Sequence, residues 1–339
     1  MHVVHVLAGD EEGGLENHVV QLANHLVQLG INVSVAAHAK YEKRFSADVN
    51  VVPVDLSRSR NNPLALFEAA RALQAIQADI VHAHASKAAA IVSRLSSWAP
   101  GKTVATVHSV KRKTRAFESM DALIGVSQGV LRAINHDKKY VVFNGLVRGK
   151  AEQVEPASLR AQLGIDDDLP VSLAVGRLVS VKRFDRLIRA WKPYFGHLLI
   201  VGDGPEKRHL ESEIRKRNLQ RVVRLLGYID NARSLMSGAD LLICSSEREG
   251  FSYTLAEALV SKLPVLSTRV AGAEEVLPGA FVVEHKDCSL QQGIERCLSD
   301  LERLNTDYEP VFTWASKHLT VENMAAETCA AYRDIMAAA

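Results

Sequence analysis

The segment Glu249-Gly-Phe-Ser-Tyr-Thr-Leu-Ala-Glu257 carries two carboxylates, one on each side of the point where a helical pattern begins. The run before it, Ala239 to Ser246, is apolar enough for a buried parallel strand. The segment therefore leaves the carboxyl end of a strand and opens a helix, where open α/β sheets bind ligands. The helix N-terminus suits an anion, and Glu249 and Glu257 can accept hydrogen bonds from hydroxyl groups. A ligand that carries both phosphate and several hydroxyl groups would fit this segment, and a nucleotide-sugar is such a ligand.

Short β-branched runs alternate with helix-patterned stretches on both sides of this segment, which predicts parallel, doubly wound α/β sheets. The 339 residues are long for one compact domain, so two are expected. Residues 147–169 are charged and irregular and form the predicted linker. The domains are then residues 1–146 and 170–315, both Rossmann-like, followed by a helix-patterned tail.

The composition is that of a globular protein with ordinary cores. The hydrophobic fraction is 47% and the formal net charge is +2, too small to imply nucleic acid as the main partner. No stretch approaches ~20 uninterrupted apolar residues, and the run Met1 to Ala8 fits a buried strand better than a signal peptide. A cytoplasmic location is expected. The cysteines are scattered without zinc or disulfide spacing.

A basic turn follows the strand predicted at 171–175. Gly176 and Arg177 come at the strand end, and Lys182 and Arg183 precede a helix. Arginine can clamp a diphosphate through its planar fork, and lysine can act as a point charge. The alternative is a solvated, salt-bridged helix start, which the matching position of the carboxylate segment disfavours.

Glycines also follow two other strands. Gly13 and Gly14 open the first helix, so the backbone there can approach a phosphate or sugar closely. This is not the G-x-G-x-x-G pattern of dinucleotide enzymes, and a dehydrogenase is disfavoured. The turn Gly202-Asp-Gly204-Pro205 is, by itself, only a strand-to-helix connection.

Three histidines lie at or near strand ends. His82 and His84 point to one face of a strand, so a metal site would need a third ligand, and satisfied interior histidines are the commoner outcome. His108 sits at a carboxyl strand end, where a ligand would lie. The basic run Lys111, Arg112 and Lys113 suits an anionic lipid head group or an acidic acceptor, or else is a solvated loop.

These motifs together resemble the retaining GT-B glycosyltransferases of family 4, a group that includes bacterial lipopolysaccharide and exopolysaccharide enzymes. The E-x7-E segment from Glu249 to Glu257 is the strongest element. Support comes from Gly176-Arg177 with Lys182, Gly202 to Pro205, Asn144-Gly145 and Gly13-Gly14-Leu-Glu16. The resemblance covers nearly the whole chain and implies two domains facing across a cleft, with the tail helix, about 316–339, packed back on the first.

The resemblance also implies residue roles. Arg177 and Lys182 would bind the donor diphosphate, Glu257 the ribose hydroxyls, and Glu249 and His108 the transferred sugar. Gly14 would approach the diphosphate. The remaining donor contacts would come from Gly176 and the backbone of Phe251, Ser252, Tyr253, Thr254 and Leu255. No metal or other cofactor is expected.

The expected activity is transfer of a sugar, with retention, from a UDP- or GDP-linked donor to a hydroxyl acceptor. The acceptor would belong to lipopolysaccharide, capsule or exopolysaccharide assembly, with peripheral inner-membrane contact through Lys111, Arg112 and Lys113. Two alternatives remain: a non-catalytic nucleotide-sugar-binding subunit of a glycan assembly complex, and an epimerase on the same architecture.

Ser252, Lys262 and Ala271 stand where the family usually has glycine, and Glu274 where it has proline. Lys262 is expected at a left-handed helix C-terminus.

Overall fold

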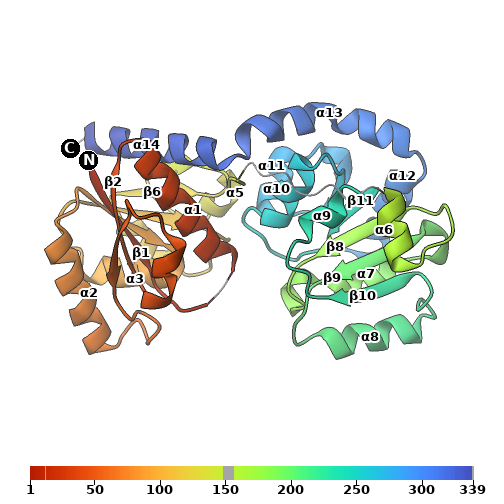
Figure 1. Ribbon diagram of the computed structural model, residues 1–339, viewed down its shortest axis with the longest axis horizontal. Coiled ribbons are helices and arrows are strands. Elements are labelled where there is room, and N and C mark those ends of the chain that lie inside the picture. Colours follow the sequence, from red (N-terminus) through yellow and green to blue (C-terminus); the bar gives the residue numbers. More distant parts are fainter. Residues whose placement is uncertain (12, 148–155, 338–339) are drawn as a thin grey trace. The chain divides into compact units, whose positions relative to one another are not determined.

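The computed structural model describes residues 1–11, 13–147 and 156–337. The chain divides into two compact units (Figure 1). Unit 1 comprises Met1–Val147 and His318–Ala339, and unit 2 comprises Arg148–Lys317. None of the described helices is both long and apolar enough to cross a bilayer.

Unit 1 is built on a parallel sheet flanked by helices. Its strand order is β3 (Asn50–Pro53), β2 (Asn32–Ala37), β1 (His2–Leu7), β4 (Ile80–His84), β5 (Lys102–Val107), β6 (Ala122–Gly125) and β7 (Lys139–Val141). Its helices are α1 (Gly14–Gln28), η1 (Ala39–Arg44), α2 (Pro63–Ile76), α3 (Ala85–Arg94), α4 (Arg115–Glu118), α5 (Gln128–Leu131) and α14 (Val321–Ala337). The direction of successive crossovers reverses between β1 and β4, which makes their carboxyl ends a ligand-binding position.

The C-terminal helix α14 completes the core of unit 1. It packs against α1 (Figure 1), and its apolar side chains join one cluster with the strands. Tyr332 on α14 is fully buried, and its hydroxyl lies 2.5 Å from His82 Nδ1 on β4. Leu146 bridges Thr320 in parallel, so the start of α14 is also fixed by backbone pairing.

Unit 2 repeats the architecture. Its parallel sheet has the order β10 (Val223–Gly227), β9 (His197–Val201), β8 (Val171–Val175), β11 (Leu241–Cys244), β12 (Val265–Thr268) and β13 (Val282–Val283). Its helices are α6 (Pro156–Leu163), η2 (Ser180–Lys182), α7 (Phe184–Ala190), η3 (Pro193–Phe195), α8 (Lys207–Lys216), α9 (Arg233–Met236), α10 (Tyr253–Val260), α11 (Ala271–Val276), η4 (Gly279–Phe281), α12 (Asp287–Leu298) and α13 (Leu301–His318). Here the reversal falls between β8 and β11.

The expectation of an irregular linker over 147–169 is wrong for its second half. Residues 156–163 form α6, with Leu159 fully buried, and Ile165 just beyond it is buried as well. The Arg160 guanidinium donates to the carbonyl oxygens of Asp167 and Leu169, both at 2.8 Å. The charged residues after α6 therefore form a surface turn whose carbonyl oxygens are hydrogen-bonded by Arg160. Residues 148–155 lie outside the described residues.

Helix α13 lies mostly before the tail helix that was expected at about 316–339. Pro310 lies in its interior, where proline removes a helical hydrogen bond. Burial outweighs that cost. Tyr308 and Phe312 are almost fully buried, and the Tyr308 hydroxyl donates to the carbonyl oxygen of Val265 on β12. The helix is thus held by packing on the sheet.

Helix α10 ends at the expected left-handed residue, with Lys262 at φ 58°. The Lys262 N–H donates to Leu259 O at 3.2 Å and the Leu263 N–H to Ala258 O at 2.9 Å, which is a Schellman motif. A side chain in this conformation is strained by about 1 kcal/mol relative to glycine.

We expect Lys262→Gly to raise the free energy of unfolding by up to ~1 kcal/mol, because glycine removes this strain. Urea unfolding of the full chain measures the change. Lys262→Ala is the matched control, since it removes the charge and keeps the Cβ. An equal gain in both variants would show that the charge, not the conformation, carries the cost.

Candidate active site

Two loops meet at the carboxyl ends of β8 and β11, on either side of the reversal in the unit 2 sheet. Residues 176–183 follow β8, and residues 245–252 follow β11 and lead into α10. The Glu247 N–H donates to Val181 O at 2.8 Å, and the Ser245 hydroxyl donates to Lys182 O at 2.8 Å. The loops are therefore hydrogen-bonded to one another at the position where such sheets bind ligands.

Glycines allow the first loop to pack closely on its neighbour. A Cβ on Gly202, whose φ is 136°, would lie 2.0 Å from the carbonyl oxygen of Gly176. The Leu178 N–H donates to Asp203 O at 2.8 Å across the same contact. The turn from Gly202 to Pro205 thus supports the basic loop from behind, a role that the sequence pattern alone did not show.

Lys182 and Glu249 form an ion pair between the two loops. Lys182 Nζ lies 2.5 Å from Glu249 Oε1, and both side chains are one-fifth exposed. The Ser246 hydroxyl donates to the same carboxylate oxygen at 2.8 Å. A cation and a hydroxyl therefore already occupy one face of Glu249, and both can be exchanged for ligand groups.

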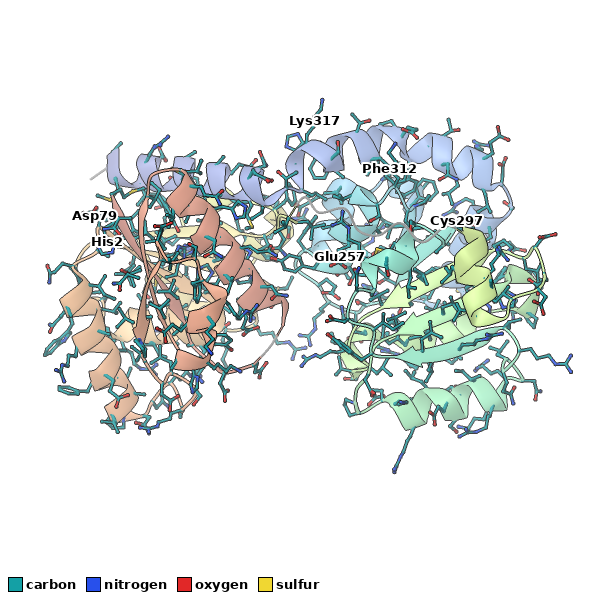
Figure 2. The ribbon with its side chains drawn as sticks, in the orientation of Figure 1. His2, Asp79, Glu257, Cys297, Phe312 and Lys317 are labelled. Carbon is teal, nitrogen blue, oxygen red and sulfur yellow. The ribbon has the colours of Figure 1, made fainter. Side chains whose placement is uncertain are left out.

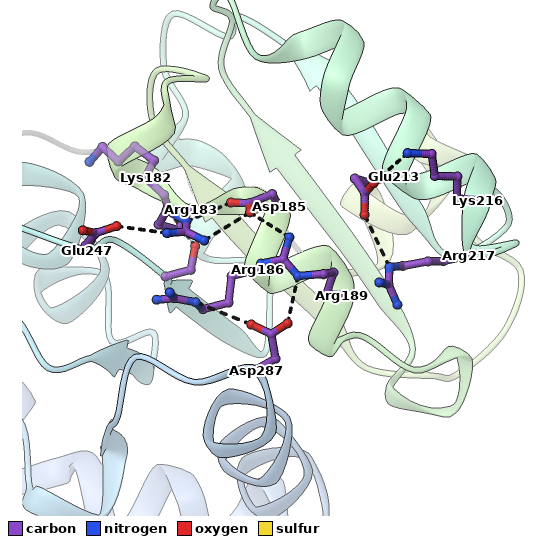
Figure 3. A network of polar contacts seen from close by, with 11 residues as sticks. Lys182, Arg183, Asp185, Arg186, Arg189, Glu213, Lys216, Arg217, Glu247 and Asp287 are labelled. Atoms are coloured by element: carbon purple, nitrogen blue, oxygen red, sulfur yellow. Dashed lines mark hydrogen bonds and ion pairs between the residues drawn. The ribbon is translucent and has the colours of Figure 1, made fainter.

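The adjacent arginines serve a network that anchors α7 (Figure 3). Arg183 pairs with Asp185 at 3.1 Å and with Glu247 at 3.0 Å. Arg189 pairs with Asp185 and Asp287, both at 2.8 Å. The hydrogen bonds to Asp185 and Glu247 hold the pKa of the Arg183 guanidinium above its usual value, against partial burial. The Arg183 side chain therefore has a structural role, because both of its ion pairs are with carboxylates of the protein.

Arg177, in contrast, projects from the loop as an exposed side chain with no ion pair to another described residue. It comes directly after Gly176, whose φ is 152°. A Cβ at Gly176 would lie 3.2 Å from Lys182 Cε, so glycine here lets the Lys182 stem pass close to the backbone. Of the cations in this loop, Arg177 and Lys182 remain suited to an anionic ligand.

Helix α10 directs its N-terminus to the same edge of the sheet. Ser252 is its N-cap residue, and the side chain of Ser252 makes no capping hydrogen bond. The N–H groups of Tyr253, Thr254 and Leu255 open the helix and have no partner within it. Phe251 and Leu255 are buried, and their packing fixes the direction in which the chain enters α10.

Glu257 lies one turn further along α10 (Figure 2), and its side chain is mostly buried. Burial raises the pKa of its carboxyl to about 7, against the opposing effect of nearby Arg233. Burial and the neighbouring Glu257 also raise the pKa of Tyr253, whose hydroxyl is buried without a hydrogen-bond partner among the described residues. The hydroxyl of Tyr253 and the carboxyl of Glu257 are both suited to hydrogen bonds with hydroxyl or amide groups.

A pocket in unit 2 lies between the two loops and is lined by the Lys182–Glu249 pair. Its lining includes side chains from both loops and from three strands: Val175, Lys182, Phe184, Ile243, Cys244, Ser245, Ser246, Glu249, Gly250, Ser252, Leu255, Ser267, Val270 and Ala273. Burial raises the pKa of the Cys244 thiol to about 12, so this cysteine is not a nucleophile at neutral pH.

The predicted residues of unit 1 lie at the corresponding edge of its own sheet. Gly14 begins α1 directly after the loop that follows β1, and His108 follows β5. The His108 ring packs edge-on against His18, with 4.7 Å between ring centroids. Burial and the neighbouring His18 hold the pKa of His108 well below its usual value, so its imidazole is neutral.

Of the residues expected in unit 2, Lys182, Glu249, Ser252 and Leu255 line one pocket, and Gly176 lies close to the Lys182 side chain. The other predicted residues, Arg177, Phe251, Tyr253, Thr254 and Glu257, are not among the residues that line it. The donor contacts expected for Gly14 and His108 stay predictions.

The sequence analysis missed Ser246 and Arg233. Ser246 could have been found from its place two residues after β11, at a ligand-binding edge. Arg233 carries no local signal, because only the fold places it near Glu257.

Comparison with known proteins identifies both halves of the chain. Residues 157–307 match the family described as "Glycosyl transferases group 1", and residues 12–146 match "Glycosyltransferase Family 4". An uncharacterized glycosyltransferase of Methanocaldococcus jannaschii is 24% identical over an alignment covering 96% of this chain and 95% of that protein.

Two further matches point the same way. The GPI3 subunit of phosphatidylinositol N-acetylglucosaminyltransferase from Saccharomyces cerevisiae is 26% identical, with 84% of this chain and 71% of that protein covered. The crystal structure of Anabaena HepE in complex with UDP shares the fold, with a TM-score of 0.83 at 19% identity over 98% of this chain and all of that one. The chain belongs to the family 4 glycosyltransferases of the GT-B fold.

Proposed function

We propose that the protein transfers a sugar from a nucleotide-diphosphate donor to a hydroxyl acceptor, with retention of configuration. The observation that carries this proposal is the Lys182–Glu249 pair beside the N-terminus of α10 at the ligand-binding edge of unit 2. Cation, carboxylate and free N–H groups match the diphosphate, the sugar hydroxyls and the phosphate oxygens of such a donor. The UDP complex of HepE supports a nucleotide ligand.

Donor binding would rearrange this pair. A diphosphate near Arg177 attracts the Lys182 ammonium, which weakens its 2.5 Å contact with Glu249. Glu249 is then available to accept hydrogen bonds from sugar hydroxyls. Glu257, further along α10, would accept from the ribose.

Charge development explains why the cations matter. As the bond from the sugar C1 to the phosphate oxygen breaks, negative charge grows on the leaving diphosphate, and Arg177, Lys182 and the α10 N–H groups stabilise it. The acceptor oxygen forms the new bond to C1, and its proton passes to the leaving phosphate. Glu249 has no nucleophilic role here, although retaining glycosidases use a carboxylate in that way.

The alternative of a non-catalytic donor-binding subunit has one supporting observation, since the Saccharomyces cerevisiae relative is named as a subunit of its transferase. Donor turnover separates the two accounts. Binding alone stabilises the fold, whereas transfer or slow hydrolysis also releases a nucleoside diphosphate.

We expect one UDP- or GDP-sugar to raise the melting temperature and to release its nucleoside diphosphate slowly, because a ligand stabilises the state that binds it. Arg177→Ala should lower turnover roughly ten- to a hundred-fold, from loss of one charge-assisted contact of ~1.5–3 kcal/mol. Glu257→Ala should abolish the thermal shift. Arg217→Ala, on the remote pair with Glu213, is the matched control (Figure 3).

Stabilisation without release, even with candidate acceptors present, would favour the binding subunit. If no donor stabilises the chain, the site itself is wrongly assigned.

The raised pKa of Glu257 has a measurable effect on stability. The pKa of the carboxyl is about 7 in the folded state and 4.5 in the unfolded chain. Between these values the folded state binds more protons than the unfolded chain, so the free energy of unfolding falls as pH rises. We expect Glu257→Gln to be more stable than wild type by about 3 kcal/mol at pH 8 and nearly equally stable near pH 4.5. Urea unfolding at both pH values, without donor, provides the measurement. A gain that is the same at both would show that ionisation is not the cause.

We further propose that the acceptor is anionic, a lipid-linked or lipopolysaccharide-core glycan. A hollow in unit 1 is lined by Arg60, Ser86, Ala90, Ser93, Arg94, Lys111, Lys113, Arg115, Ala116 and Phe117. None of these lining residues is acidic, so their charge attracts phosphate groups or anionic head groups. Lys111 and Lys113 line the hollow, whereas Arg112 between them does not.

Reversing the charge of Lys111, Arg112 and Lys113 should weaken sedimentation with anionic vesicles, since each basic residue near such a surface contributes ~1 kcal/mol. Reversing Lys43 and Arg132, which are also exposed in unit 1, is the control. Unchanged vesicle association of the triple variant would reject membrane contact through this run.

A further inference from the structure

Five histidines gather at the carboxyl edge of the unit 1 sheet. His5 lies on β1, His82 and His84 on β4, His18 on α1, and His108 follows β5. His82 and His84 have ring centroids 4.2 Å apart, and His84 and His108 5.8 Å apart. They flank the β1–β4 reversal, the ligand-binding position of this sheet.

The ring nitrogens of this cluster are not equally engaged. His82 uses both, with Tyr332 Oη at 2.5 Å and Thr106 Oγ1 at 2.7 Å. His82 is therefore the satisfied interior histidine that the sequence suggested. In contrast, His5 Nε2, His84 Nδ1 and His108 Nε2 are buried atoms without a hydrogen-bond partner among the residues described.

We propose that His18, His84 and His108 form a binding site for a divalent transition metal ion such as Zn²⁺. Each offers one ring nitrogen, and these atoms lie within 4.8 Å of one another. Three imidazoles are a known zinc ligand set, and imidazole also suits Cu²⁺, Ni²⁺ and Co²⁺. Tetrahedral zinc with bonds of ~2.05 Å needs nitrogens about 3.4 Å apart, so small side-chain rotations close the site.

The hydrogen bonds made by the second ring nitrogens of His18 and His84 favour metal binding by His18, His84 and His108. Asn144 Oδ1 accepts from His18 Nδ1 at 3.1 Å, which leaves Nε2 of His18 with its lone pair. His84 Nε2 lies 2.8 Å from His5 Nδ1, so when Nε2 donates, the unpartnered Nδ1 of His84 is the basic atom. A metal-binding histidine commonly donates its second nitrogen in this way, which fixes ring and tautomer.

A second set, His5, His82 and His84, has equally close nitrogens. It is less suited, because a metal there would have to displace Tyr332 or Thr106 from His82. The first set requires no such loss. It also includes His108, a half-buried residue whose Nε2 is a buried, unpartnered atom.

Backbone strain beside His84 is consistent with a functional position. Ala85 has φ 62°, in the left-handed region that a residue with a Cβ disfavours. This conformation lets α3 begin immediately after β4, at the residue that follows His84. Strain of this kind costs about 1–2 kcal/mol and tends to persist where function requires the geometry.

The experiment is a Co²⁺ titration of the metal-stripped full-length protein, followed by visible absorption and calorimetry. We expect one Co²⁺ per chain with the intense visible bands of tetrahedral coordination, displaced by one equivalent of Zn²⁺. His84→Ala and His108→Ala should each weaken binding at least tenfold, and Asn144→Ala about tenfold through loss of ring orientation. His25→Ala and His209→Ala, outside the cluster, are the matched controls.

Wild-type binding no tighter than that of His84→Ala, or loss of binding in His209→Ala, would overturn the site. Circular dichroism checks that each variant folds, and His108→Gln replaces any alanine variant that does not. None of these measurements uses a nucleotide-sugar, so their outcome is independent of the donor assignment.

Discussion

The constraint on which the rest depends is the parallel sheet with a reversal in the direction of its crossovers. Parallel strands end at one edge, and at the reversal two neighbouring loops turn to opposite faces and leave room between them. In unit 2 these are the loops after β8 and β11, and in unit 1 those after β1 and β4. The candidate ligand groups of each unit lie on or next to such loops. The fold thus concentrates chemistry at two places, one in each unit.

Charge pairing decides which of the nearby cations remain for a ligand. Arg183 and Arg189 are held between carboxylates in bonds that build α7, whereas Lys182 has a partner, Glu249, that belongs to the same proposed ligand site. Replacing that partner by a diphosphate costs little, because one charge-assisted contact is exchanged for another. Sequence position alone does not distinguish these residues, since Lys182 and Arg183 are adjacent.

The α/β alternation and the strand–loop–helix around Glu249 could be predicted from the sequence, because strand hydrophobicity and helix periodicity are local signals. The GT-B fold was implied by the resemblance of the motifs to family 4. Helix α13 and the helix α6 in the expected linker could not. In the first, burial of Tyr308 outweighs Pro310, and in the second, a charged surface conceals a buried Leu159. The environments of Glu257, His82 and His84 also required the structure, since their partners come from distant parts of the chain.

The two ligand edges share a further property, which is that ionisable groups are buried there without full compensation. Burial favours the neutral form of Glu257 in unit 2 and of His84 and His108 in unit 1. An apolar residue of similar size would stabilise either position more, because unpartnered buried polar atoms cost about 1–3 kcal/mol. Packing therefore does not account for these residues. In the two sites proposed above, a ligand that supplies the missing hydrogen-bond or metal contact would recover that free energy only in the complex, so the same groups would be a source of affinity.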